Sequence, residues 1–175
     1  MRAVLWSALL SVSLAAERPE HAAQIERVLD RAFGPGRFAK TSERVRERGA
    51  MHEPRLSRVA IEPSGDVIGV CRVWRVEAGA PLYFLGPLAV DPAAQHAGLG
   101  ADLVRAAVTA CRTAGGAGAI ALVGAQAFFA PLGFGVVPPA RILLPGPVDA
   151  ARLMWLELRP GGLDNVAGPL RAPTR

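Results

Sequence analysis

Apolar residues recur along this chain at two spacings, and the spacing predicts where strands and helices lie. Residues 11–15 alternate polar and apolar positions, which indicates a half-buried strand. Over residues 21–33 the apolar positions recur at helical spacing, and a Gly-Pro-Gly cluster ends that helix. A second, mostly polar helix is expected over residues 42–48, opened by Thr41 or Ser42 as its cap.

Strands follow these helices. Residues 57–61 and 67–76 flank a Glu-Pro-Ser-Gly-Asp turn, which predicts a hairpin. Residues 82–90 form a nearly continuous apolar run, as expected of a central strand covered on both faces. Pro87 interrupts this run without a backbone N–H to donate, so it should mark a bulge or a local split between strands.

The second half of the chain begins with the strongest helical pattern, over residues 98–114, which a pair of glycines ends. A short buried strand is expected at residues 119–123 and a short helix at 125–130. Further short strands are expected at residues 134–137, 141–144 and 153–158. The tail from about residue 159 is rich in glycine and proline and should be loosely held.

Together these elements give a mixed α/β (α+β) arrangement with a largely antiparallel half and one strand–helix–strand crossover. It predicts one layer of sheet covered by helices, in a single domain spanning residues 1–175. Apolar residues make up 51% of the chain and charged residues 20%, which excludes a disordered protein.

Charge and cysteine content narrow the partners. The formal net charge is +5 and all basic residues but Lys40 are arginine, yet there is no basic run, aromatic ladder or recognition motif, so no nucleic-acid partner is expected. No apolar stretch is long enough to cross a bilayer.

Cys71 and Cys111 lack the spacing of metal ligands, so we expect no metal. We expect both to be reduced, half-buried thiols in a cytoplasmic protein. A single disulfide between them is also compatible with the sequence.

The N-terminus allows two interpretations. Residues 1–14 resemble a short signal peptide, with Ala15-Ala16 as a cleavage site, which would make the protein an exported one. Because the same residues lead directly into a well-formed helix and supply the first strand of the sheet, we favour the structural interpretation.

The segment from Gly86 to Ala101 has the features of an anion site. A buried strand, a proline-led turn and a glycine-rich loop lead into the first turn of a helix, where unpaired backbone N–H groups and the helix dipole converge. Gly98 and Gly100 leave the main chain open to an approaching anion, because neither carries a Cβ. A diphosphate would fit such a loop. The glycines are not a dinucleotide-binding fingerprint, because they follow three antiparallel strands, and no Gly-Lys-Ser/Thr of a P-loop is present.

The same segment carries a family resemblance. Gln95-His-Ala-Gly-Leu-Gly100 is similar to the Gln/Arg-x-x-Gly-x-Gly/Ala signature of the GNAT superfamily of acyl-CoA N-acyltransferases. A Leu-x-Val-x-Pro string precedes it at residues 88–92, and Phe-Ala-Pro-Leu-Gly-Phe follows the next strand at 129–134. The chain resembles most the YhbS-like branch, over residues 11–160.

The resemblance implies a GNAT-like fold, in which a central mixed sheet is splayed between its fourth and fifth strands and flanked by helices. It also implies acetyl-CoA as cosubstrate, with its pantetheine arm in the splay and its pyrophosphate on the glycine loop. The backbone of Leu88, Ala89 and Val90 would pair with the arm and polarise the acetyl carbonyl. The residues implied to bind the cofactor are Leu88, Ala89, Val90, Gln95, His96, Ala97, Gly98, Leu99, Gly100 and Ala101.

One departure from the family pattern leaves two functions open. Much of the family has a tyrosine as general acid at the position of Phe129, and the YhbS-like branch often has one at Phe128. Neither phenylalanine has a proton to give, so the catalytic residues are unknown. The chain is expected to transfer an acetyl group to a primary amine of a small molecule or a protein by direct attack in a ternary complex. The alternative is a catalytically impaired acyl-CoA-binding module. A monomer or a homodimer is expected.

Other chemistry-bearing side chains are given structural roles at this stage. Tyr83 is interpreted as an ordinary strand aromatic rather than as a substitute acid. Trp74 and Phe38 are interpreted as core residues rather than as pocket walls, and His52 and Glu53 as solvated loop residues rather than as part of an acceptor pocket. The arginines Arg44, Arg46, Arg48 and Arg55 are interpreted as a solvated face rather than as a site for an acidic acceptor.

Overall fold

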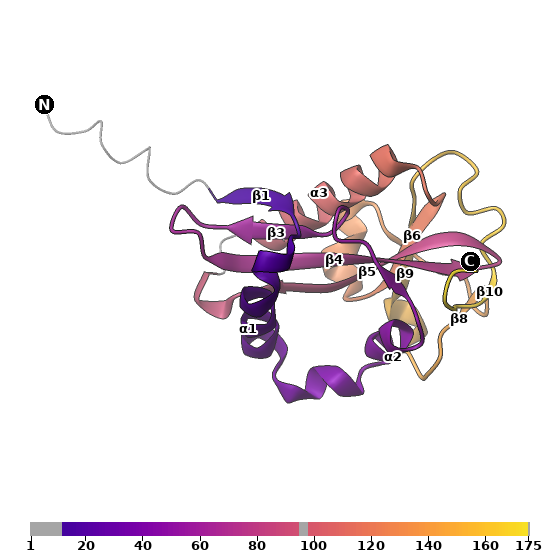
Figure 1. Ribbon diagram of the computed structural model, residues 1–175. Coiled ribbons are helices and arrows are strands. Elements are labelled where there is room, and N and C mark those ends of the chain that lie inside the picture. Colours follow the sequence, from indigo (N-terminus) through magenta and orange to yellow (C-terminus); the bar gives the residue numbers. More distant parts are fainter. Residues whose placement is uncertain (1–11, 95–97, 175) are drawn as a thin grey trace, which may run out of the picture.

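The computed structural model of the protein describes residues 12–94 and 98–174 (Figure 1). The strands are β1 (Ser13–Ala16), β2 (Met51–His52), β3 (Arg58–Ile61), β4 (Val67–Ala78), β5 (Ala80–Val90), β6 (Ala119–Val123), β7 (Gly135–Val136), β8 (Ile142–Leu143), β9 (Leu153–Glu157) and β10 (Gly168–Pro169). The helices are α1 (Ala22–Phe33), α2 (Thr41–Glu47), α3 (Leu99–Ala114) and α4 (Gln126–Phe129). Short 3-10 turns are η1 (Pro19–His21), η2 (Pro35–Ala39), η3 (Pro92–Ala94), η4 (Ala130–Leu132) and η5 (Ala150–Arg152).

The main sheet runs in the order β1-β3-β4-β5-β6-β9-β7, with β2 paired to β4. Within this sheet β5 and β6 pair in parallel, and the other neighbouring strands are antiparallel. The long α3 makes the crossover between the two parallel strands, as a parallel connection requires. The predicted mixed sheet flanked by helices is therefore confirmed.

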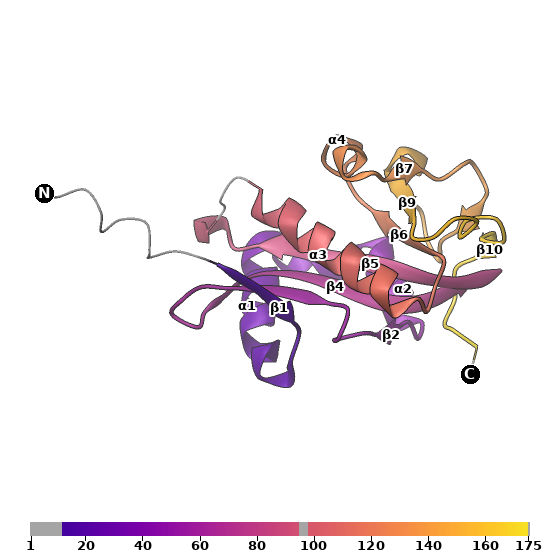
Figure 2. The same cartoon turned by 90° about the horizontal axis from the view of Figure 1, so that it is seen from above.

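Helices cover both faces of this sheet, and the alternation of side chains along β4 shows which helix covers which face. Val70 packs in one cluster with Ile25 and Leu29 of α1, whereas Cys71 packs in another with Leu103 of α3. In Figures 1 and 2, α1 and α2 accordingly lie on one side of the sheet and α3 on the other.

The pairing of β5 changes sharply along its length. It pairs with β4 almost from end to end, but with β6 only at Tyr83 and Phe84. Next to this point Val73 faces Leu85 and Cys71 faces Leu88, so β5 carries one residue more than β4 and forms a bulge at Gly86 and Pro87. The Gly86–Pro87 peptide bond is cis. The predicted bulge and split at Pro87 are both present.

Most predicted elements are confirmed to within a few residues, but the tail from about residue 159 is not loosely held. Val166 is fully buried and Leu170 is 7% exposed, because β10 pairs with β8 and Arg141 donates to the carbonyl of Val166 at 2.7 Å. The chain then lies antiparallel to β4 at Arg171, where Arg171 and Glu77 each donate a backbone N–H to the carbonyl of the other. The tail is thus part of the packed domain.

Smaller expectations need correction as well. The cap of α2 is Lys40, not Thr41 or Ser42, because the Thr41 hydroxyl donates instead to the carbonyl oxygen of Pro147.

Cys71 and Cys111 are free, as expected, but both are fully buried rather than half-buried. Burial raises the pKa of the Cys71 thiol well above its ordinary range and that of Cys111 to about 12.

The first strand forms over Ser13–Ala16 and pairs with β3, which agrees with the structural interpretation of this stretch, although residue 11 lies outside the described part. No helix in the described ranges is long and apolar enough to cross a membrane.

Candidate functional site

A cavity of about 650 Å³ opens on the side of the sheet that α1 and α2 cover. Its floor consists of residues 85–88 of β5 and residues 122–125 at the end of β6, which is the point where the two strands diverge. Its walls come from α1, η2 and α2 on one side and from the segment 147–152 on the other. The cavity therefore reaches from the surface into the split of the sheet.

The split leaves main-chain groups of β5 without a strand partner. The N–H of Asp91 donates to the carbonyl of Ile68 in β4 at 2.8 Å. Backbone groups along a strand point alternately to its two sides, so Ala89 also faces β4 while Leu88 and Val90 face the divergent side. Of the three predicted contact residues in β5, Leu88 and Val90 thus present their N–H and C=O groups to the split, and Ala89 does not.

The loop after β5 begins at a fixed carboxylate. The Asp91 carboxylate accepts a hydrogen bond from the N–H of Ala93 at 2.9 Å. It also forms an ion pair with Arg31 of α1, at 2.8 Å. These two contacts lower the pKa of the Asp91 carboxyl, the backbone N–H having the larger effect. Asp91 therefore ties the start of the loop to α1.

The other end of the loop is the amino-terminal turn of α3. Gly98 is its N-cap, with φ +96°, and the first helical hydrogen bond runs from the N–H of Asp102 to the carbonyl of Gly98. The N–H groups of Leu99, Gly100 and Ala101 precede that bond, so they have no partner within the helix. The predicted residues Gln95, His96 and Ala97 lie outside the described part of the chain.

The two glycines of this turn differ in their surroundings. A Cβ at Gly98 would meet no atom within 4 Å, although the left-handed backbone there disfavours any other residue. A Cβ at Gly100 would lie 3.5 Å from the ring of Phe128, which is an ordinary contact. Phe128, which is 39% exposed, thus stands beside the amino-terminal turn of α3.

The neighbouring Phe129 lines the cavity at the end of β6. Its ring is 7% exposed and packs edge-on against Phe134, with ring centroids 5.6 Å apart. It also lies so close to the backbone of Gly124 that no Cβ would fit there. The position that the family resemblance assigns to a general acid therefore presents only carbon to the cavity.

A polar network lies behind the cavity wall formed by Arg72 of β4. The Arg72 guanidinium donates to both carboxylate oxygens of Glu17, at 2.9 and 3.1 Å, and reaches Glu26 at 3.4 Å. The Nε2 atom of His52 lies 3.2 Å from Glu17 and 3.2 Å from the hydroxyl of Ser57. Burial would raise the pKa of the Glu17 carboxyl, but hydrogen bonds and positive charge from His52 and Arg72 outweigh burial and lower it.

The surroundings of four side chains differ from those expected from the sequence. His52 is not a solvated loop residue, since it lies in β2 and its ring is 4.8 Å from that of Trp74. Glu53 pairs with Arg75. Trp74 and Phe38 both line the cavity. Phe38 is 58% exposed and so is no core residue, whereas Trp74 also packs against the core.

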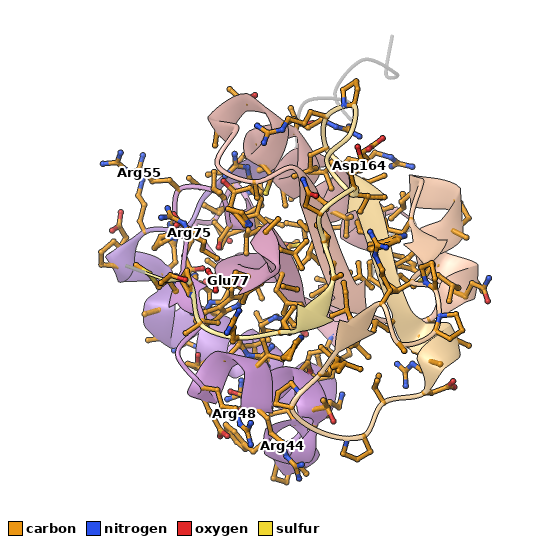
Figure 3. All side chains as sticks on the ribbon, turned by 90° about the vertical axis from the view of Figure 1, so that its right-hand side faces the viewer. Arg44, Arg48, Arg55, Arg75, Glu77 and Asp164 are labelled. Carbon is orange, nitrogen blue, oxygen red and sulfur yellow. The ribbon has the colours of Figure 1, made fainter. Side chains whose placement is uncertain are left out.

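The four arginines that the sequence places on one solvated face do not lie together in the structure. Arg46 lines the cavity and is paired with Glu43. Figure 3 shows Arg44 and Arg48 together at α2 and Arg55 apart from them, projecting from the surface. Tyr83 is an ordinary strand aromatic, as expected: it is 2% exposed, and its hydroxyl lies against Gly116, after the carboxyl end of α3.

Comparison with known proteins identifies the family. Residues 22–134 match the model of the acetyltransferase (GNAT) family, which covers more than half of the chain, so this chain belongs to that family. The family prediction made from the glycine loop is confirmed.

Two solved structures have a similar fold, and the first of them is a YhbS protein, as the predicted branch implies. The GNAT family N-acetyltransferase YhbS from Escherichia coli, in complex with CoA, is 25% identical, with a TM-score of 0.77 over 94% of this chain and 91% of that one. A GNAT family acetyltransferase from Brucella melitensis, in complex with acetyl-CoA, is 26% identical, with a TM-score of 0.67 over 94% and 97% of the two chains. No curated protein sequence matches this chain significantly.

A metal has no evident place in the described residues. Across residues 12–94 and 98–174, no three His, Cys, Asp or Glu side chains are grouped so that they could hold a metal ion.

Proposed function

We propose that this protein is an acetyl-CoA-dependent N-acetyltransferase that acts on a primary amine. The observation that carries the proposal is the divergence of β5 from β6 after Phe84, which leaves the main-chain groups of Leu88 and Val90 facing the split, where Leu88 lines the cavity. Relatives with the same fold were solved with CoA and with acetyl-CoA, and both align over more than nine-tenths of this chain.

The described residues fit such a cosubstrate in three places. The divergent edge of β5 has the alternating donors and acceptors that the amides of a pantetheine arm need. The N–H groups of Leu99, Gly100 and Ala101 suit the diphosphate, aided by the dipole of the 16-residue α3. The cavity beyond the split has the volume to admit an amine from the α1 side.

In the reaction that we propose, the neutral amine attacks the acetyl carbonyl within a ternary complex. The carbon–nitrogen bond forms, the carbon–sulfur bond breaks, and the thiolate leaves with the electron pair. The N–H of Leu88 or Val90 would stabilise the negative charge that develops on the carbonyl oxygen. Holding both reactants in one cavity supplies the remainder of the acceleration.

A second function is favoured by one observation, the carbon-only ring of Phe129. Without a proton donor there, the protein would serve as a binding module that holds an acyl-CoA without turning it over. A general acid contributes roughly 10²–10⁴ in rate. Its absence slows acyl transfer but does not forbid it, because a thiol with a pKa of about 8.5 is a moderately good leaving group.

Release of free thiol from acetyl-CoA distinguishes the two functions. We expect a panel of primary amines to include at least one that releases thiol in proportion to the acetylated amine formed. Binding of acetyl-CoA, seen as a higher melting temperature, without release for any amine would favour the binding module. Neither binding nor release would contradict both. Gly135→Glu is the control for glycine-to-glutamate variants of the site, because Gly135 lies outside the cavity with open space around it. This variant should bind acetyl-CoA and release thiol as wild type does.

A further inference from the structure

The side chain of Arg152 lies beside the place where the family resemblance assigns a general acid. Its Nε atom is 3.5 Å from the carbonyl oxygen of Gly124, and its own carbonyl accepts from the N–H of Gly124 at 2.9 Å. Gly124 is also the residue on which the ring of Phe129 packs. Arg152, Gly124 and Phe129 all line the same cavity, at the end of β6 where the sheet splits.

The charge of Arg152 is not committed to an acid. Among the described residues, no carboxylate lies within 4.0 Å of its guanidinium, although the other cavity arginines are each paired. The nearest acid along the chain, Asp149, accepts from the backbone N–H of Ala151 at 3.0 Å and so caps η5. The guanidinium is therefore available to an anion in the cavity.

The proposed reaction produces one new anion at this place. If the acetyl carbonyl lies at the free N–H of Leu88, we place the sulfur in the cavity that Leu88 shares with Gly124 and Phe129. The position that the family resemblance assigns to a general acid offers only carbon at Phe129, and the sole tyrosine, Tyr83, is buried against Gly116. A thiolate that leaves without a proton from either position needs another group to stabilise its charge.

We propose that Arg152 is a catalytic residue that stabilises the departing CoA thiolate by charge and hydrogen bonding, in place of a proton donor. This inference rests on the proposed function. The carbon–sulfur bond breaks with its electron pair on sulfur, and the guanidinium, which stays protonated throughout, interacts with that charge. The proton lost by the acetylated amine goes to solvent, and solvent later protonates the thiolate to give free CoA.

A titration of bound CoA tests this without any turnover. The ultraviolet absorbance of the thiolate, followed against pH with the protein saturated by CoA, gives the pKa of the bound thiol. We expect it to lie about one unit or more below that of free CoA in the wild-type protein and to return toward the free value in Arg152→Gln. Arg112→Gln, which removes an arginine from the last turn of α3, should match wild type. An equal pKa in Arg152→Gln and wild type overturns the inference.

Kinetics give the second test. We expect Arg152→Gln to lower kcat by roughly 10- to 100-fold while the KM for acetyl-CoA changes little, and Arg152→Lys to recover part of the loss. Adding Phe129→Tyr to Arg152→Gln should raise kcat again, because the new hydroxyl supplies the missing proton. A rise in KM with kcat unchanged would show a binding role and overturn the inference. If no amine is acetylated by wild type, the proposed function fails, whereas the thiol titration still decides whether Arg152 acts on the sulfur.

Discussion

The indole Nε1 of Trp74 donates a hydrogen bond to the carbonyl oxygen of Gly86 at 2.7 Å. Trp74 lies on β4 and Gly86 in the bulge of β5, so the bond fixes the bulge just after β5 has left β6. The indole also lines the cavity, and it lies 4.8 Å from the ring of His52 and 5.9 Å from the guanidinium of Arg46. A single side chain thus connects the split of the sheet with the wall of the cavity.

Substituting Trp74 by phenylalanine should therefore loosen the split. We expect Trp74→Phe to lower the free energy of unfolding by about 1–3 kcal/mol, because the Gly86 carbonyl loses its partner and the cavity wall loses part of a ring. Acetyl-CoA binding should weaken as well. Urea denaturation and titration calorimetry measure the two effects. Trp155→Phe, on β9 away from the cavity lining, is the control, and an equal loss in both variants would argue against a specific role for the Trp74 bond.

Glutamate at Gly98 or Gly100 should interfere with the anion site at the start of α3. At Gly98 the positive φ disfavours a side chain, and at Gly100 the side chain would begin beside Phe128. A carboxylate at either position repels a diphosphate, so we expect acetyl-CoA to bind roughly 10- to 100-fold more weakly in each variant by calorimetry. Gly135→Glu should bind as wild type does. Unchanged affinity in both Gly98→Glu and Gly100→Glu would show that the diphosphate lies elsewhere.

The lowered pKa of Glu17 predicts how stability depends on pH. A carboxyl whose pKa is lower in the folded than in the unfolded state stabilises the fold above its unfolded value, about 4.3, and loses this contribution as pH falls through its folded value. Glu17→Gln should therefore be less stable than wild type at neutral pH, by about 2 kcal/mol, and this deficit should shrink below about pH 4. Urea denaturation at pH 7 and pH 3.5 measures it. Glu20→Gln, at an exposed glutamate, is the control. A deficit that does not change with pH would contradict the assignment.

The carboxyl-terminal segment should contribute to stability. Removing residues 160–175 exposes the surface that Val166 and Leu170 bury and breaks the pairing of Arg171 with Glu77. We expect the free energy of unfolding to fall by about 3–6 kcal/mol, because each of these two buried aliphatic side chains contributes roughly 1.5–3 kcal/mol. Removal of residue 175 alone is the control. A truncated chain as stable as wild type would mean that the segment is an appendage after all.

The spacing of apolar residues and the positions of glycine and proline were sufficient to predict most of the fold. The helical period over residues 98–114, with glycines at both ends, placed α3 to within one residue, and the missing N–H of Pro87 indicated the split. These features depend on residues close in sequence, or on a backbone conformation that only a few residue types adopt. For the same reason the glycine loop identified the family without any knowledge of the fold.

The walls of the cavity could not be predicted in this way, because they depend on contacts between distant segments. Glu17 meets Arg72 across 55 residues, and Arg31 meets Asp91 across 60. Nothing in the local sequence of Trp74 distinguishes a wall residue from a core residue. No local pattern marks Arg152, since its relation to Phe129 exists only after β6 and η5 have come together at Gly124. The tail was misjudged because its glycines and prolines form packed turns instead of a flexible end.

A crystal structure with acetyl-CoA bound tests the central claim most directly. We predict that the pantetheine amides pair with the backbone of Leu88 and Val90 in the split between β5 and β6, that the diphosphate contacts the N–H groups of residues 99–101, and that the acetyl group faces the cavity under α1. Acetyl-CoA bound outside the split, with β5 and β6 closed against each other beyond Phe84, would contradict it.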